Sequence, residues 1–414
     1  MSAKNDDHDP HSLSFAEAVR RVGAAITPVS GFEQLALREA LDRVLHEDVV
    51  SPLDVPGHAN SAMDGYALRA ADLPADGERE LSVIGTVFAG HPFAGTVEAG
   101  QAVRIMTGAM LPAGADTVVK QEDTQKRGEQ VVVGTGHKPG ANVRLPGEDI
   151  RRGAVVLARG RRLTPADLGL LASLGIPEVK VFRRPRVAFF STGDELRSLG
   201  QPLGEGQIYD SNRYTLHGML TRLGVEVIDM GVVPDDRDAV REAFRTATAS
   251  ADMLITSGGV SVGEADFVKE TLQALGQVNF WKVAMKPGKP LAFGHLGNTV
   301  FFGLPGNPVS AMATFYQVVQ PSLLRLAGEQ PPERLRITVT CAERLKKAPG
   351  RLDFQRGVLS RDEHGQLVVR AAGLQGSHVL SGMSRANCFI VLPAAAGNIE
   401  AGSPVDVEPF AAFM

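Results

Sequence analysis

This chain has few cysteines and few aromatic side chains, and its positive and negative charges nearly balance. Only two cysteines, Cys341 and Cys388, occur among its 414 residues, and neither has a CxxC partner or a histidine pair nearby. The sequence therefore predicts no disulfide framework and no structural zinc site, and a reducing cytoplasm fits it. The formal net charge of −4 provides no basic surface for nucleic acid and no cationic helix for a membrane. Small molecules are the expected partners.

Long apolar runs are also absent. Nowhere do about eighteen apolar residues follow one another without charges or turn formers, so we expect no transmembrane span. The first residues, MSAKNDDHDPHS, are polar and acidic, which does not fit a secretory signal. The length exceeds that of one ordinary domain, so two to four domains are expected in a cytoplasmic protein.

Helix signals appear near the amino terminus. Ser14 and Glu17 form a capping-box pattern, and apolar residues follow at helical spacing as far as Ile26, which predicts a helix in this segment. A second helix is predicted from Phe32 to about Leu45.

The next hundred residues have a different pattern. From Val49 to Asp149, short apolar runs are punctuated by glycine and proline, which indicates a β-rich domain. A helix is predicted again after Thr164, with Pro165 at its first position and Gly175 as its stop. The β-rich block is therefore interpreted as an insertion into a helical layer.

Strand and helix patterns alternate from Arg186 onward, which indicates βαβ units and a parallel sheet. The strand candidates VAFF, VEVIDM and MLIT alternate with helix patterns at 211–223, near Asp236 and at 266–275, and a later helix is predicted over 307–326. The last block shows alternating strands without a strong helix, typical of a small β-barrel. We thus expect an α/β multidomain protein with a helical domain (1–50 plus 151–182), an inserted β-rich domain (51–150), a central parallel-sheet α/β domain (183–330) and a C-terminal β-barrel (331–414).

The segment DMLITSGGVSVGEAD, from Asp252 to Asp266, carries the clearest chemical signal. An apolar strand pattern breaks into a turn with three glycines and three hydroxyl side chains and is followed by two acids. The glycines allow close backbone approach and φ > 0, and the hydroxyls and turn amides can donate to phosphate-like oxygens. The residues concerned are Thr256, Ser257, Gly258, Gly259, Ser261, Gly263, Glu264 and Asp266. The turn is therefore predicted to bind an anion, although a lone glycine pair would more simply turn the chain.

Polar loops follow the other predicted strands as well. Asp194 and Glu195 follow VAFF, Asp235 and Asp236 follow VEVIDM, and Pro305 and Asn307 lie in GLPGNP. Ligands of open parallel sheets bind at the carboxyl ends of the strands, so these loops are expected on one rim. For Asp235 and Asp236, capping of the next helix is an equally good interpretation.

Three lysines join the acids of this rim. Lys282, Lys286 and Lys289 lie in WKVAMKPGKP, where two prolines stiffen the backbone. Lysines beside carboxylates indicate an anionic substrate together with a divalent metal, because Mg²⁺ is typically shared between acids and phosphate oxygens. The sequence offers no Ser/His/Asp grouping and no P-loop. Phosphate ester chemistry is the resulting hypothesis.

An ordered set of motifs covers nearly the whole chain and resembles the molybdopterin molybdenumtransferase (MoeA) family, to which the E domain of gephyrin is similar. The motifs are NSAMDGYA, RIMTGAMLPAGADTVV, NVRLPGEDI, STGDEL, YDSN, TSGGVSVGEAD, KVAMKPGKP, GLPGNP and DFQRG. The resemblance implies the last step of molybdenum cofactor synthesis, in which adenylylated molybdopterin and molybdate give the cofactor and AMP.

The same resemblance implies roles for individual residues. Glu195, Asp235 and Asp266 would position Mg²⁺, and the glycine turn would hold the terminal phosphate of the pterin. Catalytic roles fall on Asp64, Thr107, Asp149, Glu195, Asp235, Asp266, Lys282 and Lys286. Substrate binding falls on Thr256, Ser257, Gly258, Gly259, Ser261, Gly263, Lys289, Pro305, Asn307, Arg356 and Ser377.

The resemblance also implies a homodimer, because Asp64, Thr107 and Asp149 are expected to reach the α/β domain of a second subunit. Other proteins of the cofactor pathway are further candidate partners. His58 and Ala59 stand before NSAMDGYA at positions where the family usually has an aromatic and an acidic residue. A molybdopterin adenylyltransferase and a non-catalytic pterin-binding scaffold are the alternatives. The flanking domains argue against the first, and the absence of a long linker or a second pterin-binding domain against the second.

Overall fold

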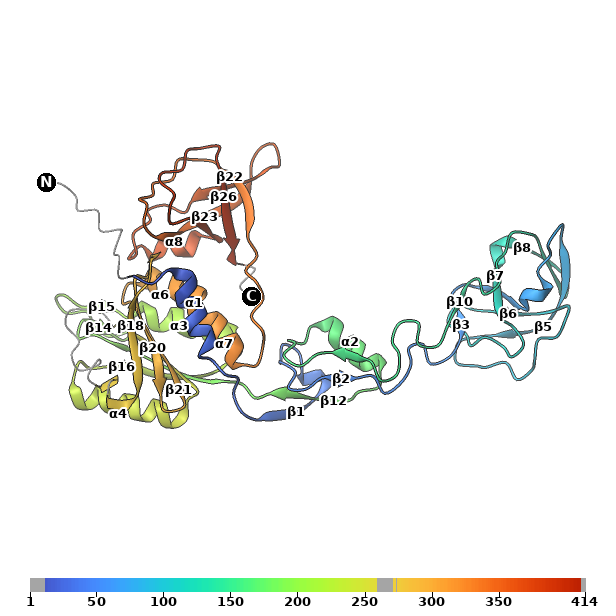
Figure 1. Cartoon of the computed structure of the whole chain (residues 1–414), viewed down its shortest axis with the longest axis horizontal. Coiled ribbons are helices and arrows are strands. Elements are labelled where there is room, and N and C mark those ends of the chain that lie inside the picture. The colour runs from blue at the N-terminus through green and yellow to red at the C-terminus, as the bar shows by residue number, and fades with distance from the viewer. Residues whose placement is uncertain (1–11, 259–270, 273, 411–414) are drawn as a thin grey trace. The chain divides into compact units, whose positions relative to one another are not determined.

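The computed structural model describes residues 12–258, 271–272 and 274–410, which form two compact units. The first unit contains residues 12–34, 42–46 and the described residues from 180 onward, and the second contains residues 35–41 and 47–179. Figure 1 labels the elements of both. Within the described residues, no helix is long and apolar enough to cross a membrane.

The first helix, α1 (Phe15–Ala24), forms where the capping pattern predicted it. Ser14 accepts a hydrogen bond from the Glu17 amide at 3.2 Å, and Glu17 in turn pairs with Arg20 and Arg21. The apolar side chains Ala18 and Val22 pack into the larger core of the first unit. Local signals were sufficient here because the cap and the apolar stripe agree.

The second predicted helix, from Phe32 to about Leu45, is wrong. Residues Phe32–Ala36 form strand β1, and only Leu37–Glu39 make a short 3₁₀ turn. β1 pairs with β12 (Glu178–Phe182), and the His46 amide donates to the Lys180 carbonyl at 3.0 Å. Backbone pairing with a segment far away in sequence has overridden the local helical pattern.

The predicted β-rich segment is confirmed. In the second unit, a six-stranded sheet has the order β7-β4-β6-β5-β9-β8. Its strands are β4 (Gly65–Leu68), β5 (Arg79–Val87), β6 (Gln101–Ile105), β7 (Thr117–Lys120), β8 (Thr124–Arg127) and β9 (Gln130–Val133). Two small apolar clusters occupy its two faces, with Tyr66 and Leu68 in one and Ala67 in the other. Short pairs join β2 (Val49–Val50) to β11 (Val155–Leu157) and β3 (Asn60–Ser61) to β10 (Val143–Arg144).

Helix α2 (Pro165–Ser173) has the predicted start. Thr164 caps it, Pro165 opens it and Asp167 completes a capping box. Gly175 follows the helix with φ +71°, a conformation that glycine adopts without strain.

The first unit is built on a six-stranded sheet of order β16-β13-β17-β21-β20-β18. β16 (Glu226–Val233), β13 (Arg186–Thr192), β17 (Met253–Ser257) and β21 (Thr299–Leu304) are parallel, as predicted. β20 (Pro290–Leu296) is antiparallel to β21 and to the edge strand β18 (Gln277–Lys282), so β18 runs in the same direction as the four parallel strands. Alternating side chains of each strand enter two different cores. Val187 and Phe189 pack with the helices α1, α3 (Ser211–Arg222), α6 (Pro308–Thr314) and α7 (Gln320–Leu326), while Phe190 packs with α4 (Arg237–Ser250) on the other face (Figure 1).

Helical residues are present in the two remaining segments where helices were predicted. The helix predicted over 307–326 is continuous, but its middle turn, Phe315–Val319, is a π-helix. The helix predicted over 266–275 begins outside the described residues, and the residues described at its end are helical.

The C-terminal barrel is confirmed. β23 (Leu352–Arg361), β24 (Leu367–Ala371), β22 (Ile337–Cys341), β26 (Pro404–Pro409) and β25 (Cys388–Leu392) pair in that order, and β25 returns to β23 and closes the ring. The short β19 (Met285–Lys286) joins β23 from outside. A short helix, α8 (Leu380–Arg385), was not predicted.

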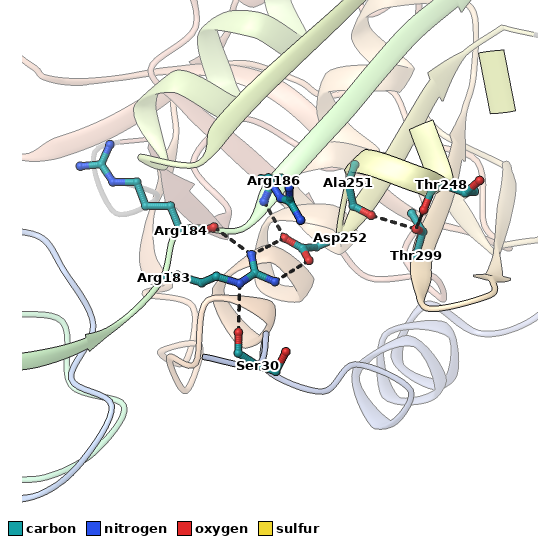
Figure 2. Close-up of polar contacts among 8 residues, drawn as sticks. All are labelled: Ser30, Arg183, Arg184, Arg186, Thr248, Ala251, Asp252 and Thr299. Atoms are coloured by element: carbon teal, nitrogen blue, oxygen red, sulfur yellow. Dashed lines mark hydrogen bonds and ion pairs between the residues drawn. The ribbon is translucent and has the colours of Figure 1, made fainter. Parts of the chain in front are cut away.

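An ion pair fixes the amino ends of the central strands (Figure 2). Arg183 donates two 2.7 Å hydrogen bonds to Asp252, which also accepts from the Arg186 amide at 2.8 Å, and the Arg183 Nε donates to the Ser30 carbonyl. Burial opposes the charge of Asp252, but Arg183 and the Arg186 amide more than offset it, so the pKa of this carboxyl is lowered. The amino ends of β13 and β17 are therefore held together by this ion pair, and the loops of the candidate site leave the opposite, carboxyl ends of the strands.

Candidate functional site

The carboxyl ends of β13, β16, β17 and β21 form one rim, because these four strands are neighbours and parallel. The loops that leave it are those beginning at Gly193, Pro234, Gly258 and Pro305. The loops predicted from the sequence to share a rim are therefore on the same edge of the sheet.

A single side chain joins two of these loops. Asn212, in the first turn of α3, is buried, and its Nδ2 donates to Ser257 Oγ at 2.7 Å and to the Gly306 carbonyl at 2.7 Å. The Gly258 amide also donates to the Leu304 carbonyl at 3.2 Å. Sequence reasoning assigned no role to Asn212, although it lies in the quoted YDSN motif, which was the available signal.

Gly258 has the backbone conformation expected of an anion-binding turn. Its φ is +91°, and a Cβ at this position would lie 2.6 Å from the Thr192 carbonyl oxygen. Only glycine fits such an approach without strain. The other predicted members of the turn, Gly259, Ser261, Gly263, Glu264 and Asp266, lie outside the described residues.

Several buried polar atoms around the rim have no hydrogen-bond partner among the residues that the structure describes. They are Ser191 Oγ, Thr192 Oγ1, Asp210 Oδ2, Asn212 Oδ1 and Thr256 Oγ1. A buried polar atom without a hydrogen bond lowers stability by about 1–3 kcal/mol, so such atoms seldom gather without a reason. Their position at the strand ends indicates a site for a ligand that both donates and accepts hydrogen bonds.

Acidic side chains meet at the ends of β13 and β16. Burial, followed by the negative charges of Asp194 and Glu195, raises the pKa of Asp235. Asp236 is the cap of α4 and accepts from the amides of Asp238 and Ala239 at 3.1 and 2.9 Å. The structure thus separates the two neighbours: Asp236 caps the helix, whereas Asp235 lies within electrostatic range of Asp194 and of Glu195, a predicted metal ligand.

The structure does not test the complete metal set. Among the described residues, no group of three or more His, Cys, Asp or Glu side chains has the spacing of a metal site. Glu195 and Asp235 are within electrostatic reach of each other, but the third predicted ligand, Asp266, is not described.

Lys282, Lys286 and Lys289 lie in one segment, whose backbone is fixed by two hydrogen bonds. Lys282 ends β18 and is exposed, whereas Lys286 and Lys289 are half-buried. The Lys282 carbonyl accepts from the Leu13 amide at 2.8 Å, and the Lys289 carbonyl accepts from the Val283 amide at 2.7 Å. These bonds fix the backbone from which the lysine side chains extend.

Gly288 keeps the same loop compact. It has φ +107°, and an added Cβ would lie 2.5 Å from Thr314 Oγ1. The loop therefore packs closely against α6.

The predicted residues after β21 and in the barrel surround the start of α6. Pro305 is buried, and Asn307 is the exposed N-cap residue, whose side chain makes no capping bond. The Ser377 carbonyl accepts from the Val309 amide at 3.1 Å. Ser377 is therefore held next to the first turn of this helix.

Arg356 supports the loop that carries Ser377. It is 1% exposed, and its guanidinium donates to the carbonyls of Leu374, Gln375 and Gly376 at 2.7, 3.1 and 3.1 Å. Burial lowers the pKa of Arg356. Its observed contacts organise the loop, and direct binding of substrate by this side chain stays a prediction.

In the second unit, two predicted residues are in direct contact. Asp64 Oδ1 accepts from the Thr107 amide at 2.7 Å and from the Thr107 hydroxyl at 2.8 Å. These bonds, with a smaller contribution from Arg104, hold the pKa of Asp64 below its usual value. Asp149 is exposed in another loop of this unit, where its amide donates to the Val55 carbonyl at 3.0 Å.

Most of the chain matches three known sequence-family models. Residues 13–175 match the MoeA N-terminal region (domain I and II), residues 188–325 a probable molybdopterin binding domain, and residues 338–410 the MoeA C-terminal region (domain IV). The molybdopterin molybdenumtransferase of Haemophilus influenzae is 51% identical over 383 residues, which is 91% of this chain and 94% of that protein. The chain belongs to the MoeA family of molybdopterin molybdenumtransferases.

Other MoeA family members agree with this assignment. The enzyme of the same name from Nostoc is 39% identical and covers 90% of this chain and 87% of its own length. The crystal structure of a molybdopterin biosynthesis MoeA protein from Pyrococcus horikoshii matches with a TM-score of 0.83 at 29% identity, and the match covers 96% of this chain and 100% of that one. The resemblance drawn from the motifs is confirmed, and so is the assignment to an enzyme.

The MoeA match also bears on the alternatives. An adenylyltransferase would account only for the central α/β part, whereas the match includes both the N-terminal and the C-terminal MoeA regions. The curated relatives carry the name of an enzyme rather than of a scaffold. Molybdenum insertion is therefore favoured over both alternatives.

Proposed function

We propose that this MoeA family member inserts molybdenum from molybdate into adenylylated molybdopterin and releases AMP at the rim of the first unit's sheet. The observation that carries the proposal is the bridging of two glycine-containing loops by Asn212, next to buried polar atoms that have no hydrogen-bond partner within the described part of the chain. Such a rim can hold a phosphorylated pterin and its pyrophosphate linkage in one orientation, which is the main requirement of phosphoryl chemistry.

The phosphate of the pterin would be held by the turn after β17. Ser257 Oγ already accepts from Asn212, so its own hydroxyl hydrogen is not used in that bond and can be donated to a phosphate oxygen. Thr256 Oγ1 makes no hydrogen bond with any residue described by the structure, and Gly258 lets the backbone approach closely. Gly259, Ser261 and Gly263 would complete the turn.

Mg²⁺ would be held by Glu195, Asp235 and Asp266. The raised pKa of Asp235, caused by burial and then by two neighbouring acids, fits this proposal because a bound divalent cation relieves repulsion between carboxylates. When bound, the ion would polarise the phosphate oxygens of the pyrophosphate linkage.

The cationic side chains would neutralise the anions. Lys282, Lys286 and Lys289 would face phosphate and molybdate, which has no base edge to recognise and is best held by ammonium and hydroxyl donors. Pro305 and Asn307 would line the rim, with Arg356 and Ser377 beside them. No protein nucleophile is needed, because positioning and charge stabilisation can carry the reaction.

A homodimer with shared sites is part of the proposal. The side chains of Met63 and Met110, near Asp64 and Thr107, are 41% and 43% exposed, and Leu145 is 62% exposed. In the first unit, Ile208 and Tyr209 are 54% and 42% exposed. They form the short strand β15, which pairs with β14 (Leu196–Arg197), the strand directly after Glu195. Exposed apolar groups beside polar site residues are typical of surfaces covered by a partner. Asp64, Thr107 and Asp149 would then act in the partner's site.

We further propose a cytoplasmic enzyme without nucleic-acid or membrane partners, to which other proteins of the cofactor pathway dock. The net charge of −4 supports the proposed absence of nucleic-acid and membrane partners, because a negatively charged protein does not attract polyanions.

The test is to incubate the purified protein with adenylylated molybdopterin, molybdate and Mg²⁺, and to measure AMP release together with activation of a molybdenum-free apoenzyme. The proposal expects both signals and their dependence on molybdate. AMP release without apoenzyme activation would indicate hydrolysis alone, and absence of both would refute the proposed reaction.

A further inference from the structure

A buried carboxylate lies beside the lysine loop. β19 and β23 pair in parallel, with Lys286 opposite Asp353, and the Leu352 amide donates to the Ala284 carbonyl at 3.0 Å. Paired residues of neighbouring strands project to the same side of a sheet. The side chains of Lys286 and Asp353 therefore extend from adjacent backbone positions to the same side and lie within electrostatic range, although they come from different parts of the chain.

The surroundings of Asp353 favour interaction with a cation. It is 4% exposed, and its Oδ2 accepts from Gln355 Nε2 at 3.0 Å. Burial raises the pKa of Asp353, and Gln355 and then the positive charges of Lys286, Lys347 and Arg351 oppose this effect. A buried carboxylate that stays ionised needs both hydrogen bonds and opposite charge.

The two nearby lysines differ in what holds them. Lys347 is 6% exposed, and its ammonium donates to the carbonyls of Ala348 and Arg351 at 3.0 and 2.9 Å, so it is already tied to the backbone. Lys286 is half-buried on the loop beside the rim. A lysine side chain has four rotatable bonds and loses much conformational entropy when it is ordered, so a fixed negative charge beside it restricts where the ammonium lies.

We propose that Asp353 is a positioning residue that orients the ammonium of Lys286 toward the anionic substrate. This inference rests on the proposed function, which gives Lys286 the task of neutralising phosphate and molybdate. Asp353 does not touch the substrate and acts through Lys286. A purely structural carboxylate at the mouth of the barrel is the competing explanation.

A double-mutant cycle separates the two explanations. AMP release is measured in the full-length protein at varied molybdate for Asp353→Asn, Lys286→Ala and the double variant. Asp353→Asn lowers kcat on the order of tenfold, the effect of a misplaced catalytic group, and changes the KM for molybdate less. In the Lys286→Ala background, Asp353→Asn causes no further loss. A structural role would instead multiply the two losses and lower the melting temperature in parallel.

Asp406→Asn is the matched control, because Asp406 also lies on the barrel and accepts a side-chain bond, from Thr338 at 2.7 Å. It leaves kcat unchanged. If Asp353→Asn does not fold, Asp353→Glu serves the same cycle, because it keeps the charge and displaces it by one methylene group. A partial loss that disappears in the Lys286→Ala background is then expected.

The pH dependence gives a second readout. Because the pKa of Asp353 is raised, the wild-type carboxyl takes up a proton before ordinary aspartates do as the pH falls, and the wild type then resembles Asp353→Asn. The ratio of wild-type to variant kcat therefore shrinks toward acidic pH. A constant ratio would overturn the inference.

The outcomes distinguish this inference from the function on which it rests. If Lys286→Ala is fully active, the proposed role of Lys286 fails and this inference fails with it. If Lys286→Ala is inactive while Asp353→Asn retains wild-type kinetics, only the inference is overturned.

Discussion

The side-chain amide of Asn212 donates to the hydroxyl of Ser257 at 2.7 Å, although the two residues are 45 positions apart. The same amide donates to the Gly306 carbonyl. Asn212 therefore sets the separation between the turn after β17 and the loop after β21, and it leaves the Ser257 hydroxyl hydrogen available to an anion.

Replacement of Asn212 by alanine should disturb both loops. Loss of one buried and one part-buried hydrogen bond lowers the free energy of unfolding by about 1–3 kcal/mol, and displacement of the phosphate-binding groups lowers kcat/KM by roughly 10- to 100-fold. Urea unfolding and AMP release measure the two effects. Thr221→Ala, at an exposed position of the same helix, is the control and changes neither. Wild-type kinetics in Asn212→Ala would show that the bridge is not needed for catalysis.

Two glycines provide a second comparison. Gly258→Ala places a Cβ 2.6 Å from the Thr192 carbonyl oxygen at φ +91°, so the free energy of unfolding falls by about 1–3 kcal/mol. Gly218 lies within α3, and a Cβ there meets no atom within 4 Å. Gly218→Ala should therefore be neutral or stabilising by up to about 1 kcal/mol. Urea unfolding of both variants checks this, and equal effects would contradict the assigned geometry.

Asp235 gives a prediction that links stability to Mg²⁺. Burial and neighbouring acids raise its pKa, so the folded protein holds this proton more tightly than the unfolded chain does. The ionised form therefore destabilises the fold above the raised pKa, and this penalty disappears as the pH falls below the unfolded value. Asp235→Asn should raise the melting temperature at neutral pH without Mg²⁺.

The same variant should lose most of the stabilisation that Mg²⁺ gives the wild type, because a metal ligand is missing. Thermal unfolding with and without Mg²⁺ tests both parts. Asp238→Asn is the control, since the Asp238 side chain is 90% exposed, and it should respond to Mg²⁺ as the wild type does. An undiminished Mg²⁺ response in Asp235→Asn would remove this residue from the metal site.

Local signals predicted much of this architecture. The cap at Ser14, the capping box at Thr164 and the alternation of strand and helix from Arg186 onward each depend on neighbouring residues, and the corresponding elements formed. The rim loops were predictable for the same reason, because the carboxyl ends of parallel strands always share an edge.

The failures have a common physical cause, which is contact between distant segments. Residues Phe32–Ala36 became a strand because they pair with Glu178–Phe182, and no local pattern reports that pairing. The role of Asn212 depends on acceptors 45 and 94 positions away. Asp353 likewise becomes relevant only when β23 is placed beside Lys286.

The contact between Asp64 and Thr107 yields a pH prediction. The Thr107 amide and, second, its hydroxyl lower the pKa of Asp64. Thr107→Val keeps the amide and removes the hydroxyl, so the pKa of Asp64 should move upward but stay below its usual value. NMR titration of the labelled aspartate carboxyl measures the shift. Thr107→Ser retains the hydroxyl and should leave the pKa of Asp64 where it is; an equal shift in both variants would show that the hydroxyl is not responsible.

Mixing of two impaired variants tests the shared sites. If Asp64 acts in the partner's site, homodimers of Asp64→Ala and of Lys286→Ala each lose most of their activity, but a mixed dimer carries both defects in one site and neither in the other. Random exchange of subunits should restore roughly one quarter of the wild-type activity, because half of the dimers are mixed and each has one intact site. AMP release is measured after the variants are unfolded and refolded together. Refolding each variant alone is the control and gives only the low residual activity of that variant. If size-exclusion chromatography shows mixed dimers but no activity returns, Asp64 and Lys286 serve the same subunit's site, and the cross-subunit arrangement is wrong.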